Sequence, residues 1–136
     1  MQVQPYVFFD GRCEEALEFY RRALGAEVTA LIRFKDNPDA RQRERVAADS
    51  ADKIMHAAFR VGETQILASD GQCLGRPTFQ GFGLSLTVPK DEDAERVFGA
   101  LADGGRVQAP LTKTFFSSRF GMVADRFGVL WMVYVA

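Results

Sequence analysis

The strongest local structural signal in the sequence is a β-hairpin at its C-terminal end. Residues 118–125 lead into a short turn, Arg-Phe-Gly at 126–128, and residues 129–135 return with the sequence VLWMVYV. Two runs of β-branched and aromatic residues separated by a short glycine-containing turn predict two paired strands. A weaker copy of this pattern, residues 59–67, closes the first half of the chain. The sequence therefore predicts one structural module that occurs twice.

Each predicted module places a strand and a helix before its closing strands. The first module has strand patterns at 3–9, 28–34, 54–61 and 64–70, and the second has them at 82–88, 107–111 and in the C-terminal hairpin. Between the first two strands of each module, apolar residues recur at the spacing of an α-helix. Its apolar stripe is Cys13, Ala16, Leu17, Tyr20 and Leu24 in the first module, and Ala94, Val97, Phe98 and Leu101 in the second.

The predicted fold class is therefore α+β, with the element order βαβββ repeated. We expect the two modules to form an open, curved mixed sheet around a cavity, with the helices outside. Module one spans 1–70, a connector with turn residues spans 71–81, and module two spans 82–136. We expect these parts to form a single domain, 1–136, because the chain has the length and composition of one.

Charge and cysteine content exclude several partners. The net charge of −1 is spread without a basic cluster, so we expect neither nucleic acid nor a membrane surface as a partner. No apolar run has the roughly twenty residues that a membrane span needs, and a cytoplasmic location is expected. The two cysteines, Cys13 and Cys73, are far apart in sequence and are expected to be reduced thiols.

The segment 35–52 is polar, contains Pro38 and mixes arginines with acids. Its apolar residues do not recur at a regular spacing, which predicts a long loop with at most one short helical turn. Loops of this length are uncommon unless they cover a site or are mobile. Two interpretations remain open: a lid over a pocket, or plain solvated chain.

The strand at 54–61 has two different faces. Its odd-numbered residues are uniformly apolar and are expected to pack beneath the helix, whereas Ile54, His56, Ala58 and Arg60 are expected to face the cavity. His56 is the only histidine, and it is predicted to be a hydrogen-bond donor, a general base or a ligand anchor, with a structural role as the alternative. Asp70 could orient His56, pair with Arg60 or cap the turn at Gly71.

Further candidate ligand-binding residues are aromatic or polar. The aromatic candidates, suited to a planar or hydrophobic small molecule, are Tyr6, Phe8, Phe116, Phe120 and Tyr134. The polar candidates are Arg33, Ser85 and Thr87. Core packing is the competing interpretation for any single aromatic residue in a chain with twelve phenylalanines, and Trp131 is expected in the core.

Four phrases in the sequence resemble a known family. They are EALEFY at 15–20, KIMHA at 53–57, LADGG at 101–105 and DRFGVLWM at 125–132. Together they resemble the PhnB-like branch (demethylubiquinone methyltransferase-like) of the vicinal oxygen chelate superfamily, which includes glyoxalase I, bleomycin-resistance proteins and extradiol dioxygenases. The resemblance covers nearly the whole chain and implies paired βαβββ modules around a cavity.

The chain departs from the metal-dependent members of this superfamily. Their ligands are His, Glu or Gln at the start of the first strand and in the last strand of each module. The matching positions here are Gln4, Ile66 or its neighbour Ala68, Gly83 and Met132, and only Gln4 has a donor oxygen. We therefore expect no metal site and no cofactor. Methyl transfer is not expected either, because no glycine-rich turn joins a strand to a helix.

The function expected from the residues and the resemblance is metal-independent binding of a small molecule. The alternative is a non-metal enzyme in which His56 is the catalytic acid or base and Arg60 or Arg33 stabilises an oxyanion. A glyoxalase-like metalloenzyme is the third possibility. We also expect a homodimer, because open sheets leave strand edges that need a partner and related proteins commonly pair their chains.

Overall fold

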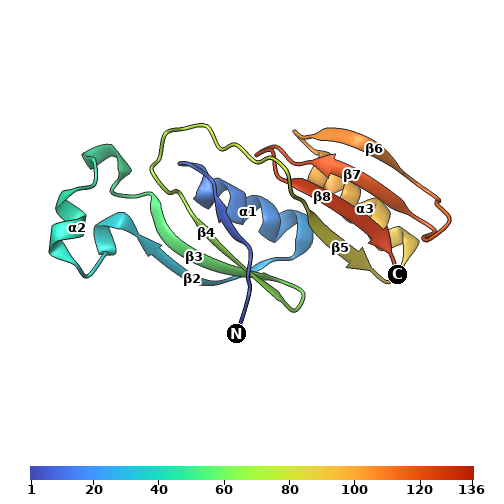
Figure 1. The fold of residues 1–136 in the computed structure, drawn as a ribbon, viewed down its shortest axis with the longest axis horizontal. Helices are drawn as coiled ribbons and strands as arrows, with labels where there is room; N and C mark the ends of the chain where they lie inside the picture. Colours follow the sequence, from blue (N-terminus) through green and yellow to red (C-terminus); the bar gives the residue numbers. More distant parts are fainter. The chain divides into compact units, whose positions relative to one another are not determined.

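A computed structural model describes all residues, 1–136, and divides them into two compact units, Met1–Pro77 and Thr78–Ala136 (Figure 1). The boundary falls inside the predicted connector, 71–81, so each unit contains one predicted module. The expectation of a single domain stays a prediction. None of the helices has the length and apolar character that crossing a membrane requires.

The first unit is a four-stranded mixed sheet with one long helix. Its elements are β1 (Tyr6–Phe8), α1 (Cys13–Leu24), β2 (Glu27–Arg33), β3 (Ile54–Val61) and β4 (Thr64–Ser69). The strand order is β1-β4-β3-β2; β1 runs parallel to β4, and the other pairs are antiparallel. Between β2 and β3 lie three short helices, η1 (Phe34–Asp36), α2 (Ala40–Glu44) and η2 (Ala48–Ser50). They form an arm that projects beyond the ends of β2 and β3 (Figure 1).

The second unit repeats this arrangement without the arm. Its elements are β5 (Leu84–Val88), α3 (Asp91–Ala102), β6 (Arg106–Thr112), β7 (Phe120–Ala124) and β8 (Leu130–Val135), in the strand order β5-β8-β7-β6. Here β5 runs parallel to β8. The predicted α+β class and the repeated βαβββ order are confirmed, and each module forms an open four-stranded sheet of its own.

In the first unit α1 covers one face of the sheet. The helix ends at Gly25, whose positive φ of 68° suits a residue without a side chain. On its inner side the Tyr20 ring stacks on Phe59 of β3, with ring centroids 5.6 Å apart and 15° between the ring planes. Ala57, two residues before Phe59, is completely buried. The prediction that the odd-numbered residues of this strand pack beneath the helix is confirmed for Ala57 and Phe59, whereas Met55 and Val61 are only partly buried.

In the second unit α3 packs on the closing hairpin. Its buried residues are the four predicted for its apolar stripe, Ala94, Val97, Phe98 and Leu101. The hairpin contributes Val123, Trp131 and Val133, all buried, and the Trp131 ring N–H donates to Asp125 Oδ2 at 2.9 Å. Trp131 therefore belongs to the core, as predicted.

Two irregularities in the pairing of β2 with β3 overturn the predicted alternation of side chains there. Val28 pairs with Phe59, but Ala30 pairs with Ala58, so one extra residue on β2 shifts the register. Further along, Ile32 pairs with His56 and Arg33 with Ile54, so the extra residue is Met55 on β3. Beyond this second bulge Ile54 and Arg33 face α1, and Ile54 is completely buried instead of lying beside His56.

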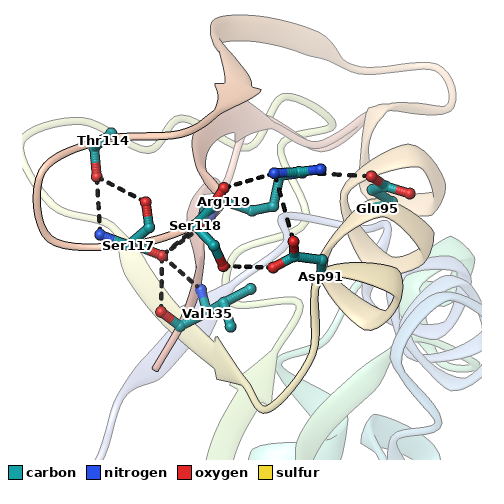
Figure 2. Close-up of polar contacts among 7 residues, drawn as sticks. All are labelled: Asp91, Glu95, Thr114, Ser117, Ser118, Arg119 and Val135. Atoms are coloured by element: carbon teal, nitrogen blue, oxygen red, sulfur yellow. Dashed lines mark hydrogen bonds and ion pairs between the residues drawn. The ribbon is translucent and has the colours of Figure 1, made fainter.

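The loop before β7 is fixed to the rest of the second unit by a network of polar side chains (Figure 2). Ser117 is buried; its Oγ donates to the Val135 carbonyl at 2.7 Å and accepts from the Val135 N–H at 3.1 Å. Ser118 Oγ hydrogen-bonds Asp91 at the start of α3, and the Arg119 guanidinium contacts Asp91 and Glu95. This network joins β8, the loop and the first turns of α3.

Candidate functional site

The face of the first sheet opposite α1 carries the candidate site. Tyr6 and Phe8 project from β1 on this face, while Val7 and Phe9, on the other side of the strand, are buried. The hydroxyl of Tyr6 lies 2.9 Å from Nδ1 of His56 on β3, and the rings of Tyr6 and Phe8 stack with centroids 4.9 Å apart. Tyr6 is 41% exposed and Phe8 54% exposed, so both rings are open to a ligand. We call Tyr6, Phe8 and His56 the aromatic patch.

The hydrogen bond between Tyr6 and His56 determines which ring nitrogen of His56 carries the proton. Partial burial is the main cause that raises the pKa of Tyr6 above 10.0; repulsion from Cys13 adds to this rise, and a hydrogen bond with Ser69 opposes it. Tyr6 is therefore a neutral phenol near neutral pH and can donate to Nδ1 of His56. A neutral imidazole that accepts at Nδ1 carries its proton on Nε2, which makes Nε2–H a donor for a bound molecule.

The predicted arginines do not join the aromatic patch. Arg33 lies on the α1 side of the sheet, where its guanidinium donates to Glu14 at 2.6 and 3.1 Å and to the Asp52 carbonyl at 2.7 Å. Arg60 pairs with Glu27 at 2.7 Å, four residues and about 13 Å along β3 from His56. Both guanidinium groups are already engaged with a carboxylate.

Asp70 has none of the roles considered from the sequence. Its carboxylate is buried, and Oδ1 accepts from the N–H groups of Gly11 at 2.8 Å and Cys13 at 2.7 Å. Oδ2 accepts from the N–H of Ile54 at 2.7 Å. Arg12 occupies the N-cap position of α1, but its side chain makes no capping hydrogen bond. Asp70, 57 residues after Cys13 in the sequence, caps the helix in its place.

The remaining candidates lie in the second unit, on the sheet face opposite α3. Ser85 and Thr87 of β5 pair with Met132 and Tyr134 of β8, and Tyr134 pairs with Phe120 of β7. The ring of Phe116, from the loop, meets Phe120 edge to face with centroids 5.1 Å apart. The structure thus brings Ser85, Thr87, Phe116, Phe120 and Tyr134 to one face of the second sheet, and their role in binding a ligand stays a prediction.

The residues present do not fit the superfamily's metal site. No group of three or more His, Cys, Asp or Glu side chains lies close enough to hold a metal ion. Ile66 and Ala68, the positions matched to ligands in the first module, pair with Phe59 and Ala57 and face α1. The residues of β4 that share the face of His56 are Gln65, Leu67 and Ser69, which corrects the predicted register of that strand.

A hollow of about 340 Å³ lies between the arm and the turn that follows β4. It was not predicted as a binding site, although the unusual length of segment 35–52 allowed the interpretation that this segment covers a pocket. The structure shows that the arm forms one wall of the hollow. Its lining residues are Phe34, Arg45, Val46, Ala47, Ser50, Gly71, Gln72 and Cys73.

The fold and these faces place the chain in a class of α+β proteins, those built from paired βαβββ modules with one open sheet face each. The family model of the Glyoxalase/Bleomycin resistance protein/Dioxygenase superfamily matches residues 2–133, and the chain belongs to this superfamily. The resemblance inferred from the four sequence phrases is confirmed.

Similar proteins support this assignment. The chain is 34% identical to protein YjdN of Escherichia coli K12, over 99% of this chain and 95% of that protein. It is 42% identical to the solved structure of PA1353 from Pseudomonas aeruginosa, with a TM-score of 0.84 over 99% of this chain and 97% of that one. A structure from Bacillus cereus, titled a putative 3-demethylubiquinone-9 3-methyltransferase and PhnB protein, is 25% identical, with a TM-score of 0.83 and full coverage of both chains.

Proposed function

We propose that the protein binds a small, planar aromatic molecule on the open face of its first sheet, without a metal ion. The observation that carries this proposal is the hydrogen bond of 2.9 Å between Tyr6 Oη and His56 Nδ1, next to the exposed ring of Phe8. A ring of the ligand would stack on Phe8 and Tyr6, and a carbonyl or similar acceptor would receive the Nε2–H of His56.

Membership of the superfamily supports a small-molecule ligand, because its name covers enzymes and resistance proteins that act on small molecules. The Bacillus cereus protein is described as a putative methyltransferase, but we do not propose methyl transfer for this chain. No strand in this chain is joined to a helix by the glycine-rich turn that holds a nucleotide-like cofactor.

The binding test uses the neutral fluorescent probe N-phenyl-1-naphthylamine. We expect its fluorescence to rise on binding to the native protein and its affinity to fall at least threefold in Phe8→Ala, because a stacking surface is removed. Phe115→Ala is the matched control, since Phe115 is completely exposed and lies outside the aromatic patch. Absence of binding, or an equal loss in both variants, contradicts the proposal; circular dichroism establishes that each variant is folded.

A second function, acid–base catalysis without a metal, is favoured by the same Tyr6–His56 hydrogen bond. Tyr6 donates to Nδ1 of His56, so Nε2–H faces a bound substrate; as that proton passes to a basic atom of the substrate, the phenolic proton of Tyr6 moves to Nδ1, and both protons return in the reverse step. The oxyanion role considered for Arg33 and Arg60 is weakened, because both are in ion pairs with glutamates. In this mechanism His56 is the catalytic residue, and Tyr6 positions its ring and relays the proton.

The test of this second function measures which ring nitrogen of His56 carries the proton. Long-range ¹H–¹⁵N spectra of the neutral His56 should show the proton on Nε2 in the native protein and a mixture of tautomers in Tyr6→Phe. Native mass spectrometry of the purified protein then separates the two functions: a bound molecule recovered unchanged supports binding, and conversion that is lost in His56→Ala supports catalysis. A native protein with the proton on Nδ1 excludes the proposed positioning by Tyr6.

A further inference from the structure

We propose that the hollow between the arm and the turn after β4 is a second binding site, for a small organic acid held by Arg45. Arg45 is the only charged residue among those that line the hollow. Beside it lie polar groups from Ser50 and Gln72 and the apolar side chains of Phe34 and Val46. This combination matches a molecule with a carboxylate at one end and a compact hydrocarbon body.

The positive charge of Arg45 is not neutralised within the structure. Some arginines of the first unit pair with carboxylates, as Arg33 does with Glu14 and Arg60 with Glu27, whereas Arg41 and Arg76 make no ion pair and do not line the hollow. Arg43, also on the arm, donates to the carbonyl of Asn37. Arg45 has no such partner, and no Asp or Glu lines the hollow. An anion that enters would supply the missing partner of the guanidinium group.

Cys73 adds no opposing charge to the hollow. Burial is the main cause that raises the pKa of the Cys73 thiol, and repulsion from Asp70 adds to the rise, while a hydrogen bond with Ser50 partly opposes it. The group is therefore a neutral thiol near neutral pH. The formal charge lining the hollow is the single positive charge of Arg45.

Both walls of the hollow are held in place before any ligand binds. On the arm, Asp39 accepts from the N–H of Arg41 at 2.9 Å and so caps α2, and Asn37 donates to Gln42 at 2.8 Å. On the turn, the N–H of Cys73 donates to the carbonyl of Asp70 at 3.1 Å, and Asp10 accepts from the N–H of Arg76 at 2.9 Å. A volume of about 340 Å³ is at the lower end of ligand pockets, which suits a compound of one ring.

The experiment titrates benzoate into uniformly ¹⁵N-labelled protein and follows the backbone amide signals and the side-chain Nε–H of Arg45. We expect the largest shifts at Arg45, Ala47, Gln72 and Cys73. Benzamide, which has the same shape but no charge, should bind about tenfold more weakly, because a charge-assisted hydrogen bond is lost.

Two matched variants test the role of Arg45. Arg45→Gln and Arg41→Gln each remove one positive charge from the arm, but Arg41 does not line the hollow. We expect benzoate affinity to fall about tenfold in Arg45→Gln and less than twofold in Arg41→Gln. Amide spectra of the free variants establish that the arm keeps its structure.

Three results overturn this inference: equal losses in the two variants, equal affinities for benzoate and benzamide, or shifts centred on the aromatic patch. Gly71 lines the hollow, and a Cβ added to it would lie 3.2 Å from the Phe8 ring, so the two sites are neighbours and the position of the shifts is decisive. Failure of benzoate at the hollow leaves the neutral probe at the aromatic patch unaffected, so this test and that of the proposed function fail separately.

Discussion

Asp70 connects three parts of the first unit through one buried carboxylate. It accepts hydrogen bonds from the N–H groups of Gly11, Cys13 and Ile54, at distances of 2.7–2.8 Å. Hydrogen bonds to a charged group in a buried place are stronger than those between neutral groups, and a donor left unpaired there is costly. The side chain therefore has a structural role that its position beside a turn glycine did not indicate.

Replacing Asp70 by Asn should lower the free energy of unfolding by about 2–3 kcal/mol, because the amide keeps one acceptor oxygen and turns an N–H₂ group toward N–H donors. Urea denaturation followed by circular dichroism measures this change. The matched control is Asp39→Asn, at the exposed N-cap of α2, where Asn caps as well as Asp and the expected change is below about 0.5 kcal/mol. Equal effects in the two variants would contradict this account of Asp70.

The two thiols should differ in reactivity with iodoacetamide. Cys13 is completely buried and its pKa is raised mainly by desolvation, so we expect no alkylation until the protein unfolds. Cys73 is partly exposed, but its pKa is also raised. Because the thiolate is the reactive form, a raised pKa lowers the rate at pH 8, and the rate should still increase above pH 9. Mass spectrometry of samples quenched at each pH checks this order; modification of Cys13 in the folded protein would contradict it.

At the scale of elements, the join between α3 and the closing hairpin depends on a glycine. A Cβ at Gly105 would lie 2.3 Å from the carbonyl oxygen of Ala124 and 3.0 Å from that of Leu101. Both neighbours are backbone atoms, which cannot move aside without shifting β7 or the end of α3. The glycine pair after α3 thus allows β6 to start close to the hairpin.

We expect Gly105→Ala to lower the melting temperature by at least 5 °C, as overpacking typically costs about 1–3 kcal/mol. Gly99→Ala is the control, because Gly99 lies inside α3 and a Cβ added there would meet no other atom within 4 Å. That change should raise the free energy of unfolding by about 0.5–1 kcal/mol through helix propensity. Differential scanning calorimetry measures both; a stable Gly105→Ala variant would show that the join is looser than the structure indicates.

Elements with a regular apolar period could be predicted from the sequence, and those with bulges could not. The helix α3, at residues 91–102, has the predicted buried stripe. The predicted side-chain directions at the paired ends of β2 and β3 were wrong, because a bulge adds one residue without any local marker in the sequence and inverts the side chains beyond it. For the same reason Arg33 was expected beside His56 but pairs with Glu14. The hollow depends on the fold of the arm, which has no periodic pattern.

At the scale of the whole molecule, we propose that two copies pair along the edge strand β2. Val28, Leu31 and Ile32 on this strand are each more than one-third exposed, although large and apolar. The outer edge of β2 has no partner strand, since β2 is the last strand in the order β1-β4-β3-β2. Unpaired strand edges and exposed apolar side chains both favour association, and a closed two-fold pair is its commonest form.

Light scattering coupled to size exclusion should give twice the chain mass of 15.1 kDa at micromolar concentration. Leu31→Lys should weaken this association at least tenfold, because a charge is placed within the contact. Leu74→Lys serves as the control: Leu74 is 76% exposed and lies in the loop after β4, so its replacement should leave the dimer intact. A monomer mass for the native protein, or equal weakening in both variants, would contradict the proposed pairing.

The remote cap on α1 has a consequence for how the first unit forms. The helix begins at Cys13, yet the carboxylate that satisfies its first N–H group is 57 residues away and follows the last strand of the sheet. During synthesis the first turn of this helix lacks its cap until β4 has returned beside β1. The same closure also secures the first residue of β3. We therefore expect the first unit to fold in one late, cooperative step, and the amides of Gly11, Cys13 and Ile54 to share a single opening reaction in hydrogen exchange.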